Sequence, residues 1–236
     1  MNKLFIAGAT GYTGQALVRT AREAGHTVVA HVRPGSTSGD RLVPVFESLG
    51  AIVDRTPWEP TPLAATLAVH APDTIFSLLG TTRARSKAAA ARGETATYES
   101  VDRDLTLMLH AAASGSSPAP RFVFLSSIGA ERPGRNRYLR ARGEVEAALA
   151  AGSLPWTSAR PSFITGPDRD EVRHGERIGA MLFDGGLRML SAVGIQGPQA
   201  RYGPMDATTL ARALLRIAAD PSTADQVVEA AALRPA

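Results

Sequence analysis

The chain alternates between short, largely apolar runs and longer segments in which apolar residues recur at helical spacing. The apolar runs have the length of buried strands and are rich in β-branched and aromatic residues. They cover residues 4–6, 26–32, 51–54, 73–79, 122–127 and 155–159, and a last short strand is expected at 226–231. Strands that are apolar throughout are typical of a parallel sheet covered by helices on both faces.

The segments between these runs are predicted to be helices. They cover residues 13–24, 40–49, 62–70, 101–113, 136–151, 178–190 and 207–218, and Asp206 is the expected cap of the last one. The basic, alanine-rich stretch 83–96 is expected to be either a loop or an extension of the following helix. This alternation predicts an α/β fold, a doubly wound parallel sheet (Rossmann fold) with a small carboxyl-terminal substrate lobe.

Three glycines fall in the turn between the first predicted strand and the first predicted helix. Gly8 permits a tight turn, Gly11 lets a pyrophosphate approach the backbone, and Gly14 lets the helix pack closely on the strand. The free N–H groups of the first helical turn attract phosphate. A simple glycine-rich turn is the alternative, but a strand before and a helix after favour a dinucleotide site. The residues expected to bind the dinucleotide here are Gly8, Thr10, Gly11, Tyr12, Thr13 and Gly14.

The end of the second predicted strand indicates which dinucleotide binds. A site that prefers NAD normally has Asp or Glu there, accepting a hydrogen bond from the ribose 2′-hydroxyl. This strand instead runs into Val32-Arg33-Pro34-Gly35-Ser36. Arg33 can hold a 2′-phosphate, with Ser36 or Ser38 as an additional hydroxyl donor. We therefore expect NADP as the cofactor rather than NAD; the alternative is that Arg33 is an ordinary surface arginine.

Candidate catalytic groups follow the fifth predicted strand. Tyr138 and Arg142 are four residues apart, so they share one face of a predicted helix. A phenol can transfer a proton at a carbonyl or carbinol oxygen, and a neighbouring cation favours its ionised form. Ser126 and Ser127 end the strand, and either hydroxyl can bind the substrate oxygen; Ser127 is favoured as closer to the strand end. Tyr138, Arg142 and Ser127 are thus the expected catalytic residues.

These motifs together resemble the short-chain dehydrogenase/reductase superfamily, in its atypical or extended NAD(P)-binding branch. The chain is most similar to the Tat-interacting-protein type of oxidoreductase, over essentially its whole length. The blocks that carry the resemblance are Gly8–Gly14, Leu79-Gly80-Thr81-Thr82-Arg83, Val101-Asp102-Arg103-Asp104, Ser126-Ser127-Ile128-Gly129-Ala130 and Tyr138–Glu146. The resemblance implies that further cofactor contacts come from Leu79, Gly80, Thr81, Tyr138, Arg142, Pro161, Ser162 and Ile164.

Arg142 departs from the pattern of this superfamily, which has lysine at that position. Arginine keeps the charge and the hydrogen-bond donors, but it is effectively never deprotonated. Cofactor binding therefore survives the exchange more easily than proton relay does.

We expect an NADP-dependent oxidoreductase that acts on a carbonyl or a secondary alcohol of a small molecule. A dinucleotide-binding regulatory or redox-sensing protein without turnover is the first alternative, and an NAD(P)-dependent epimerase is the second. Residues 1–160 are expected to form the NAD(P)-binding Rossmann core. Residues 161–236 are expected to form a small substrate lobe plus a returning helix and strand, packed with the core as one domain.

Composition excludes several classes of site. The chain has no cysteine, which excludes disulfides and thiolate catalysis, and its five histidines lack metal-ligand spacing, so no metal is expected. No apolar run is long enough to span a membrane, and the amino terminus does not resemble a signal peptide, so we expect a cytoplasmic protein without a membrane partner.

The net charge of +4 and the pI of about 9.9 raise the question of nucleic-acid binding. The arginines are scattered along the chain, apart from a local cluster at positions 132, 135, 137, 140 and 142. That cluster is expected to be a solvated or substrate-facing segment rather than a nucleic-acid site. A monomer or a homodimer is expected.

Overall fold

The structure, a computed structural model, describes residues 1–91, 93–130, 136–162, 164–165 and 204–234. Within these residues, seven strands pair in parallel in the order β3-β2-β1-β4-β5-β6-β7. The strands are β1 (Lys3–Ala7), β2 (Thr27–His31), β3 (Ile52–Asp54), β4 (Thr74–Ser77), β5 (Arg121–Leu125), β6 (Trp156–Arg160) and β7 (Gln226–Glu229). The expected doubly wound parallel sheet is confirmed.

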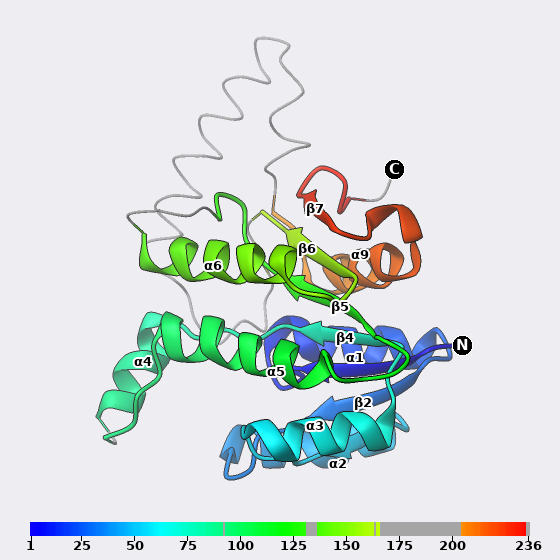
Figure 1. The fold of residues 1–236 in the computed structure, drawn as a ribbon. Coiled ribbons are helices and arrows are strands. Elements are labelled where there is room, and N and C mark those ends of the chain that lie inside the picture. Colours follow the sequence, from blue (N-terminus) through cyan, green and yellow to red (C-terminus); the bar gives the residue numbers. More distant parts are fainter. Residues whose placement is uncertain (92, 131–135, 163, 166–203, 235–236) are drawn as a thin grey trace.

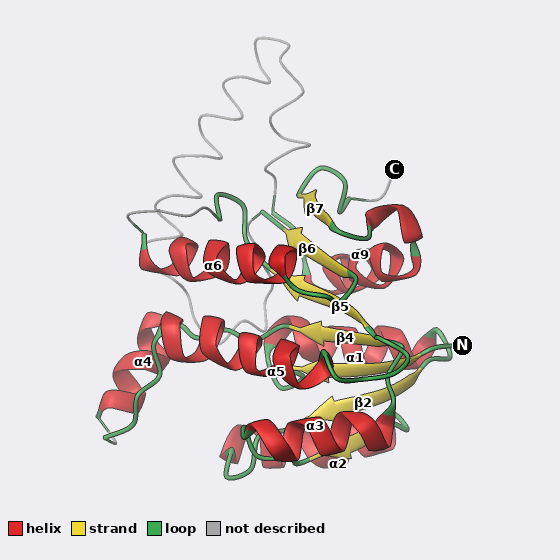
Figure 2. Ribbon diagram, in the orientation of Figure 1, coloured by secondary structure: helices red, strands yellow, loops and turns green. Residues whose placement is uncertain are grey.

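Helices cover both faces of this sheet (Figures 1 and 2). The helical elements are α1 (Tyr12–Glu23), α2 (Thr37–Ser48), α3 (Pro60–His70), α4 (Arg83–Ala90), the π-helical turn η1 (Tyr98–Asp104), α5 (Leu105–Ala113), α6 (Arg137–Ala151), α9 (Ala207–Ala219) and the short η2 (Pro221–Thr223). One hydrophobic cluster joins α1, α2 and α9 to the sheet, and a second joins α3, α5 and α6 to its other face.

Alternation along the first strand explains how one strand serves both clusters. Leu4 and Ile6 point into the cluster under α1 and α9, whereas Phe5 and Ala7 point into the cluster under α3 and α5. Successive side chains of a strand point to opposite faces, so a strand buried on both faces is apolar at most positions.

Three helical elements differ from the expectation because of local capping and turn geometry. Helix α2 begins three residues early, because the Ser36 hydroxyl accepts a hydrogen bond from the Gly39 N–H at 3.1 Å and caps it. Residues 83–90 form their own helix, α4, which projects away from the sheet (Figure 1). The predicted helix 101–113 divides into η1 and α5, and Thr97 and Ser100 form a reciprocal capping box at the start of η1.

The carboxyl-terminal elements complete the same sheet. Strand β7 pairs with β6, with Ser158 opposite Val227, and α9 packs beside α1. Asp206 caps α9 as expected, accepting from the backbone N–H groups of Thr208 and Thr209 at 2.9 Å. The predicted helix 178–190 lies outside the described residues, so the division into a core and a substrate lobe stays a prediction.

Two buried histidines make the stability of this fold depend on pH. Burial lowers the pKa of His31 below its ordinary value of 6.5, although a hydrogen bond to the Thr56 carbonyl and the Asp54 carboxylate act in the opposite direction. Burial also lowers the pKa of His110, whose Nε2 has no hydrogen-bond partner among the described residues. Below pH 6.5 the unfolded chain therefore binds more protons than the folded chain.

We expect the melting temperature to fall as the pH is lowered from about 7.5 to about 5.5, because protonation of these histidines stabilises the unfolded state. Thermal unfolding followed by circular dichroism at the two pH values measures this. Replacing His110 with leucine removes one of the two titrating groups and breaks no hydrogen bond of the ring Nε2. The variant His110→Leu should therefore show a smaller pH dependence than the wild type. A melting temperature that is equal or higher at the lower pH contradicts the assignment.

Candidate active site

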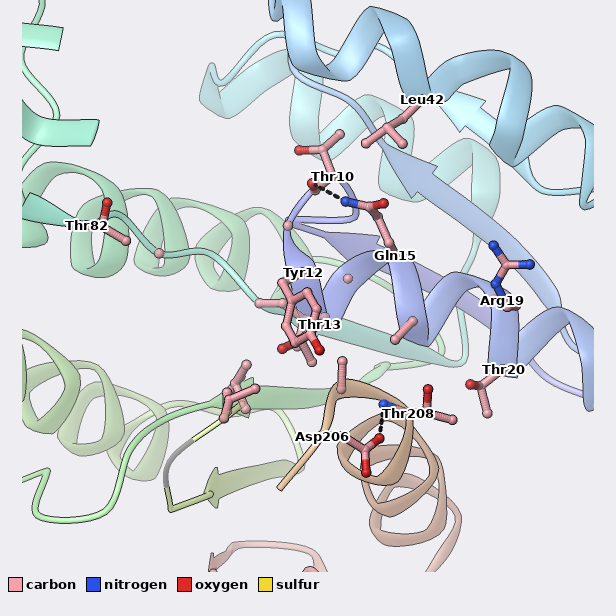
Figure 3. A pocket seen from close by; sticks show the side chains of 18 of the residues that line it. Thr10, Tyr12, Thr13, Gln15, Arg19, Thr20, Leu42, Thr82, Asp206 and Thr208 are labelled. Atoms are coloured by element: carbon pink, nitrogen blue, oxygen red, sulfur yellow. Dashed lines mark hydrogen bonds between the residues drawn. The ribbon is translucent and has the colours of Figure 1, made fainter. Parts of the chain in front are cut away.

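A cleft of about 1030 Å³ opens at the carboxyl ends of β1, β4 and β5. Its walls come from the glycine turn and α1, from the loop after β4, from the end of β5, and from α2, α6 and α9. Figure 3 shows Tyr12, Thr13 and Gln15 on the α1 side of this cleft and Asp206 and Thr208 at the start of α9. Because β1 and β4 are neighbours whose connecting helices lie on opposite faces, the cleft sits at the switch point where such sheets bind ligands.

The glycine turn lets the backbone pack closely at two positions. Gly8 has a φ of +83°, and a Cβ there would lie 2.7 Å from the Leu78 carbonyl oxygen. At Gly14 a Cβ would lie 2.1 Å from the Gly8 carbonyl oxygen, so α1 approaches β1 closely only with glycine at this position. Helix α1 then begins after Gly11, and no side chain caps it.

An uncapped helix start beside a cleft fits the phosphates of a dinucleotide. The N–H groups of the first turn lack partners within the helix, and the helix dipole adds positive potential. Thr10, Gly11, Tyr12, Thr13 and Gly14 all line the cleft. The turn is held in place by the Gln15 side chain, which donates to the Thr10 carbonyl at 3.0 Å, and by the Tyr12 hydroxyl, which donates to the Thr165 carbonyl at 3.2 Å. The residues present therefore fit the diphosphate of NAD or NADP.

The Arg142 guanidinium lies in the cleft wall but is largely buried and engaged by the protein. Its Nη2 donates to the Asp102 carboxylate at 2.7 Å and to the Leu79 carbonyl at 3.0 Å, and its Nη1 donates to the Leu125 carbonyl. The Asp102 carboxylate in turn accepts from the Thr81 N–H at 2.8 Å. The blocks around residues 80, 102 and 142 thus meet in one buried cluster.

Tyr138 lies on the wall of the cleft at the start of α6. The Asn136 side chain caps this helix by accepting from the N–H groups of Tyr138 and Leu139. The Tyr138 ring packs edge-on against Tyr98 at 5.3 Å between centroids, and the Arg142 Cζ lies 5.1 Å from the ring centroid. The four-residue spacing therefore does bring the phenol and the guanidinium together.

The two serines at the end of β5 differ in position. Ser126 is buried, lines the cleft, and its hydroxyl has no hydrogen-bond partner among the described residues. Ser127 is half-buried, is absent from the cleft wall, and directs its hydroxyl to the Ile128 carbonyl at 3.4 Å. A buried hydroxyl without a partner is costly unless a ligand or water forms a hydrogen bond with it, so of the two serines Ser126 is the one whose hydroxyl can be completed from the cleft, whereas the catalytic role given to Ser127 stays a prediction.

The remaining predicted cofactor residues are only partly brought to the cleft. Gly80, Thr81 and Ile164 line it, whereas Gly8 lies behind the turn; Leu79, Pro161 and Ser162 are buried and do not line it. Arg33 is exposed beyond the end of β2 and is not part of the cleft wall, and the Ser36 hydroxyl caps α2.

The described arginines of the 132–142 cluster are paired with carboxylates. Arg137 and Arg140 contact Glu99 at 2.9 and 3.6 Å, and Arg142 contacts Asp102. Glu99 is partly exposed, and its hydrogen bond with Arg137 lowers its pKa to about 2. Positions 132 and 135 lie outside the described residues.

Sequence reasoning missed the role of Asp102 and several residues of the cleft wall. Asp102 does not line the cleft but contacts Arg142 and Thr81, which do. In the sequence it stands beside Arg103 and Asp104, so nothing there indicated its burial. Arg41 of α2 lines the cleft, but the pattern of the sequence around it does not indicate this.

The chain is similar in sequence to known proteins. Residues 8–182 match a protein family described as NAD(P)H-binding. The chain is 32% identical over 181 residues to "Protein FMP52, mitochondrial" of Candida glabrata, which covers 75% of this chain and 69% of that protein. It is 34% identical over 117 residues to "Protein fmp52, mitochondrial" of Emericella nidulans, covering 49% of this chain and 46% of that protein.

Two solved structures share the fold. The structure of AtPrR2 with NADP+ and (+)pinoresinol has a TM-score of 0.67 at 17% identity, covering 96% of this chain and 69% of that chain. A putative epimerase from Burkholderia cenocepacia J2315 has a TM-score of 0.58 at 19% identity, covering 96% of this chain and 88% of that chain.

The relatives bear on location as well. Both FMP52 proteins carry a mitochondrial name, so the cytoplasmic location stays a prediction for this chain. None of the helices in the described ranges is long and apolar enough to cross a membrane.

The family match spans most of the chain and includes the glycine turn, the β4 loop and α6. The chain belongs to the NAD(P)H-binding family.

Proposed function

We propose that this protein is an NADP-dependent oxidoreductase that interconverts a carbonyl and a secondary alcohol on a small molecule. The observation that carries the proposal is the Ser126 hydroxyl, which is buried, unpartnered among the described residues, and part of the same cleft wall as Tyr138. A hydrogen-bond donor and a phenol beside a dinucleotide site are the groups that reduction of a carbonyl requires.

Different residues of the chain bind the cofactor, orient the substrate and transfer the proton. The first turn of α1 holds the diphosphate, and a bound reduced nicotinamide supplies the hydride to the substrate carbon. The Ser126 hydroxyl donates a hydrogen bond to the carbonyl oxygen and orients it. The Tyr138 hydroxyl donates its proton to the same oxygen, so that the carbonyl becomes an alcohol; in the reverse direction the phenolate accepts that proton.

The proposal is tested by the loss of NADPH absorbance when purified protein is mixed with a panel of aldehydes and ketones. We expect at least one carbonyl compound to be reduced with equal amounts of NADPH consumed and alcohol formed. NADPH that binds but is not consumed with any member of a broad panel counts against an enzyme.

Arg33 is proposed to set the preference for NADP by binding the 2′-phosphate, because β2 ends at His31 without an acidic residue behind it. A hydrogen bond to a charged group contributes about 1.5–3 kcal/mol. We therefore expect Arg33→Ala to weaken NADPH binding at least about tenfold and leave NADH binding unchanged, as measured by nucleotide fluorescence titration.

Arg41→Ala is the matched control for this assignment, since Arg41 is also an exposed arginine and lines the cleft from α2. It should leave the ratio of the two affinities near that of the wild type. A changed ratio in Arg41→Ala with an unchanged ratio in Arg33→Ala assigns the 2′-phosphate to Arg41 instead.

A dinucleotide-responsive regulatory protein without turnover is the second candidate. The observation that favours it is the engagement of Arg142 with Asp102 and two carbonyls, which leaves this arginine unsuited to proton relay. Tight NADPH binding combined with a partner protein that binds only one redox form of the cofactor supports this function; measured turnover excludes it.

A further inference from the structure

In the described part of the site, the Asp102 carboxylate is fully buried and makes two short polar contacts. Neither the proton transfer nor the hydride transfer of the proposed reaction uses it. Its side chain is 0% exposed, although it lies in the π-helical turn η1 close to the cleft. Oδ1 accepts from Arg142 Nη2 at 2.7 Å and Oδ2 accepts from the Thr81 N–H at 2.8 Å. A carboxylate is buried in this way only when both oxygens are well satisfied.

The partner of Asp102 ties two strand ends together. Arg142 donates to the carbonyl of Leu79, just after β4, and to the carbonyl of Leu125, the last residue of β5. A Cβ at Gly80 would lie 2.9 Å from Arg142 Nη2 and 3.4 Å from Asp102 Oδ1, so the loop after β4 packs directly on the pair. The guanidinium serves three acceptors with a fork of five N–H donors, which the three donors of a lysine ammonium match less well.

The ion pair of Asp102 and Arg142 also sets how much positive charge acts on the Tyr138 phenol. The Arg142 Cζ is 5.1 Å from the Tyr138 ring centroid, but a carboxylate lies 2.7 Å from the same guanidinium. At the distance of the phenol, an ion pair this tight acts as a dipole and not as a unit positive charge. Tyr98 of η1 also faces the ring, and the nearby cations Arg137 and Arg140 are themselves paired with Glu99.

We propose that Asp102 is a positioning residue: it holds Arg142 as a brace between the ends of β4 and β5 and offsets most of its charge, so that Arg142 acts on Tyr138 as much less than a full unit cation. The brace sets the positions of the Thr81 backbone, in the loop after β4, and of Ser126, which directly follows β5. The inference rests on the proposed function only in giving Tyr138 the acid/base role.

The test is a tyrosine titration that needs neither substrate nor turnover. The chain has four tyrosines, so the ultraviolet absorbance of tyrosinate against pH is recorded for a protein and for the same protein carrying Tyr138→Phe, and the difference isolates Tyr138. Asp102→Asn keeps an oxygen for the Thr81 N–H but leaves Arg142 with an uncompensated charge. We expect the ionisation of Tyr138 to move to lower pH by about one unit or more in this variant.

The double variant Asp102→Asn/Arg142→Met leaves no buried charge and decides the matter even where the single variant does not fold. Because Asp102 already offsets most of the Arg142 charge, removing both charges should move the ionisation of Tyr138 by much less than Asp102→Asn alone does. Ionisation that moves to higher pH by about one unit in the double variant shows that Arg142 acts as a cation in spite of Asp102, and overturns the proposal. An unshifted midpoint in folded Asp102→Asn overturns it as well.

Asp104→Asn is the matched control, because Asp104 is an exposed acid in the same turn and pairs with Arg103 at the surface. Its titration should coincide with that of the wild type; an equal shift in Asp104→Asn and Asp102→Asn assigns the effect to general surface charge. Absence of turnover in the wild type removes the proposed function but leaves this result standing, since the titration reads the phenol itself.

Discussion

Replacing Gly14 by alanine should abolish NADPH binding and lower the free energy of unfolding by about 3 kcal/mol, the upper end of the cost of overpacking. The new methyl carbon would lie 2.1 Å from the Gly8 carbonyl oxygen and 2.8 Å from two backbone atoms of Ala9. These are backbone atoms that cannot rotate away, so α1 must move off β1 and its first turn leaves the position where it meets the diphosphate. Denaturant unfolding and a fluorescence titration with NADPH measure the two effects.

Gly115→Ala is the matched control for this substitution. A Cβ at Gly115 meets no atom within 4 Å. We expect its free energy of unfolding to stay within about 1 kcal/mol of the wild type and its NADPH affinity to be unchanged. A Gly14→Ala variant that binds NADPH as tightly as Gly115→Ala would show that the diphosphate does not sit on the first turn of α1.

Tyr138→Phe should reduce turnover by at least about 100-fold, the lower end of the contribution of general acid–base catalysis. The ring remains, so its contacts with Tyr98 and Arg142 persist and the helix cap at Asn136 is untouched. NADPH affinity should therefore stay near the wild-type value, and the loss should appear in kcat rather than in cofactor binding. Steady-state rates with the carbonyl identified in the panel, together with the NADPH titration, separate the two quantities.

Tyr98→Phe provides the control, because Tyr98 packs against Tyr138 but is not part of the described cleft wall. It should retain nearly full turnover. Normal turnover in Tyr138→Phe refutes the acid/base assignment, and equal losses in the two variants point to packing of the ring pair instead.

The fold was predictable because most strands are largely apolar runs that alternate with helical segments. Leu4 to Ala7 shows why: alternate side chains enter two different hydrophobic clusters, so no polar residue is tolerated at those positions. The glycine turn was predictable for a similar reason, since close contact of α1 with β1 requires glycine at position 14. Local geometry of this kind depends on residues that lie close together in the sequence.

The cluster around Arg142 was not predictable from the sequence in the same way. The spacing of Tyr138 and Arg142 gave their common helical face, but it did not give the direction of the guanidinium. That direction is set by Asp102 and by carbonyls of two neighbouring strands, which lie 40, 63 and 17 residues away along the chain. Which of the two adjacent serine hydroxyls, Ser126 or Ser127, faces the cleft likewise depends on the path of the chain after β5, which the sequence alone does not give.

The most direct test of the central claim, that the cleft at the start of α1 binds a nicotinamide dinucleotide, is a fluorescence titration of the purified wild-type protein with NADPH. We predict saturable binding of one NADPH per chain, lost in Gly14→Ala and retained in Gly115→Ala. The absence of saturable binding by the folded wild-type protein, with either NADPH or NADH, would contradict the claim.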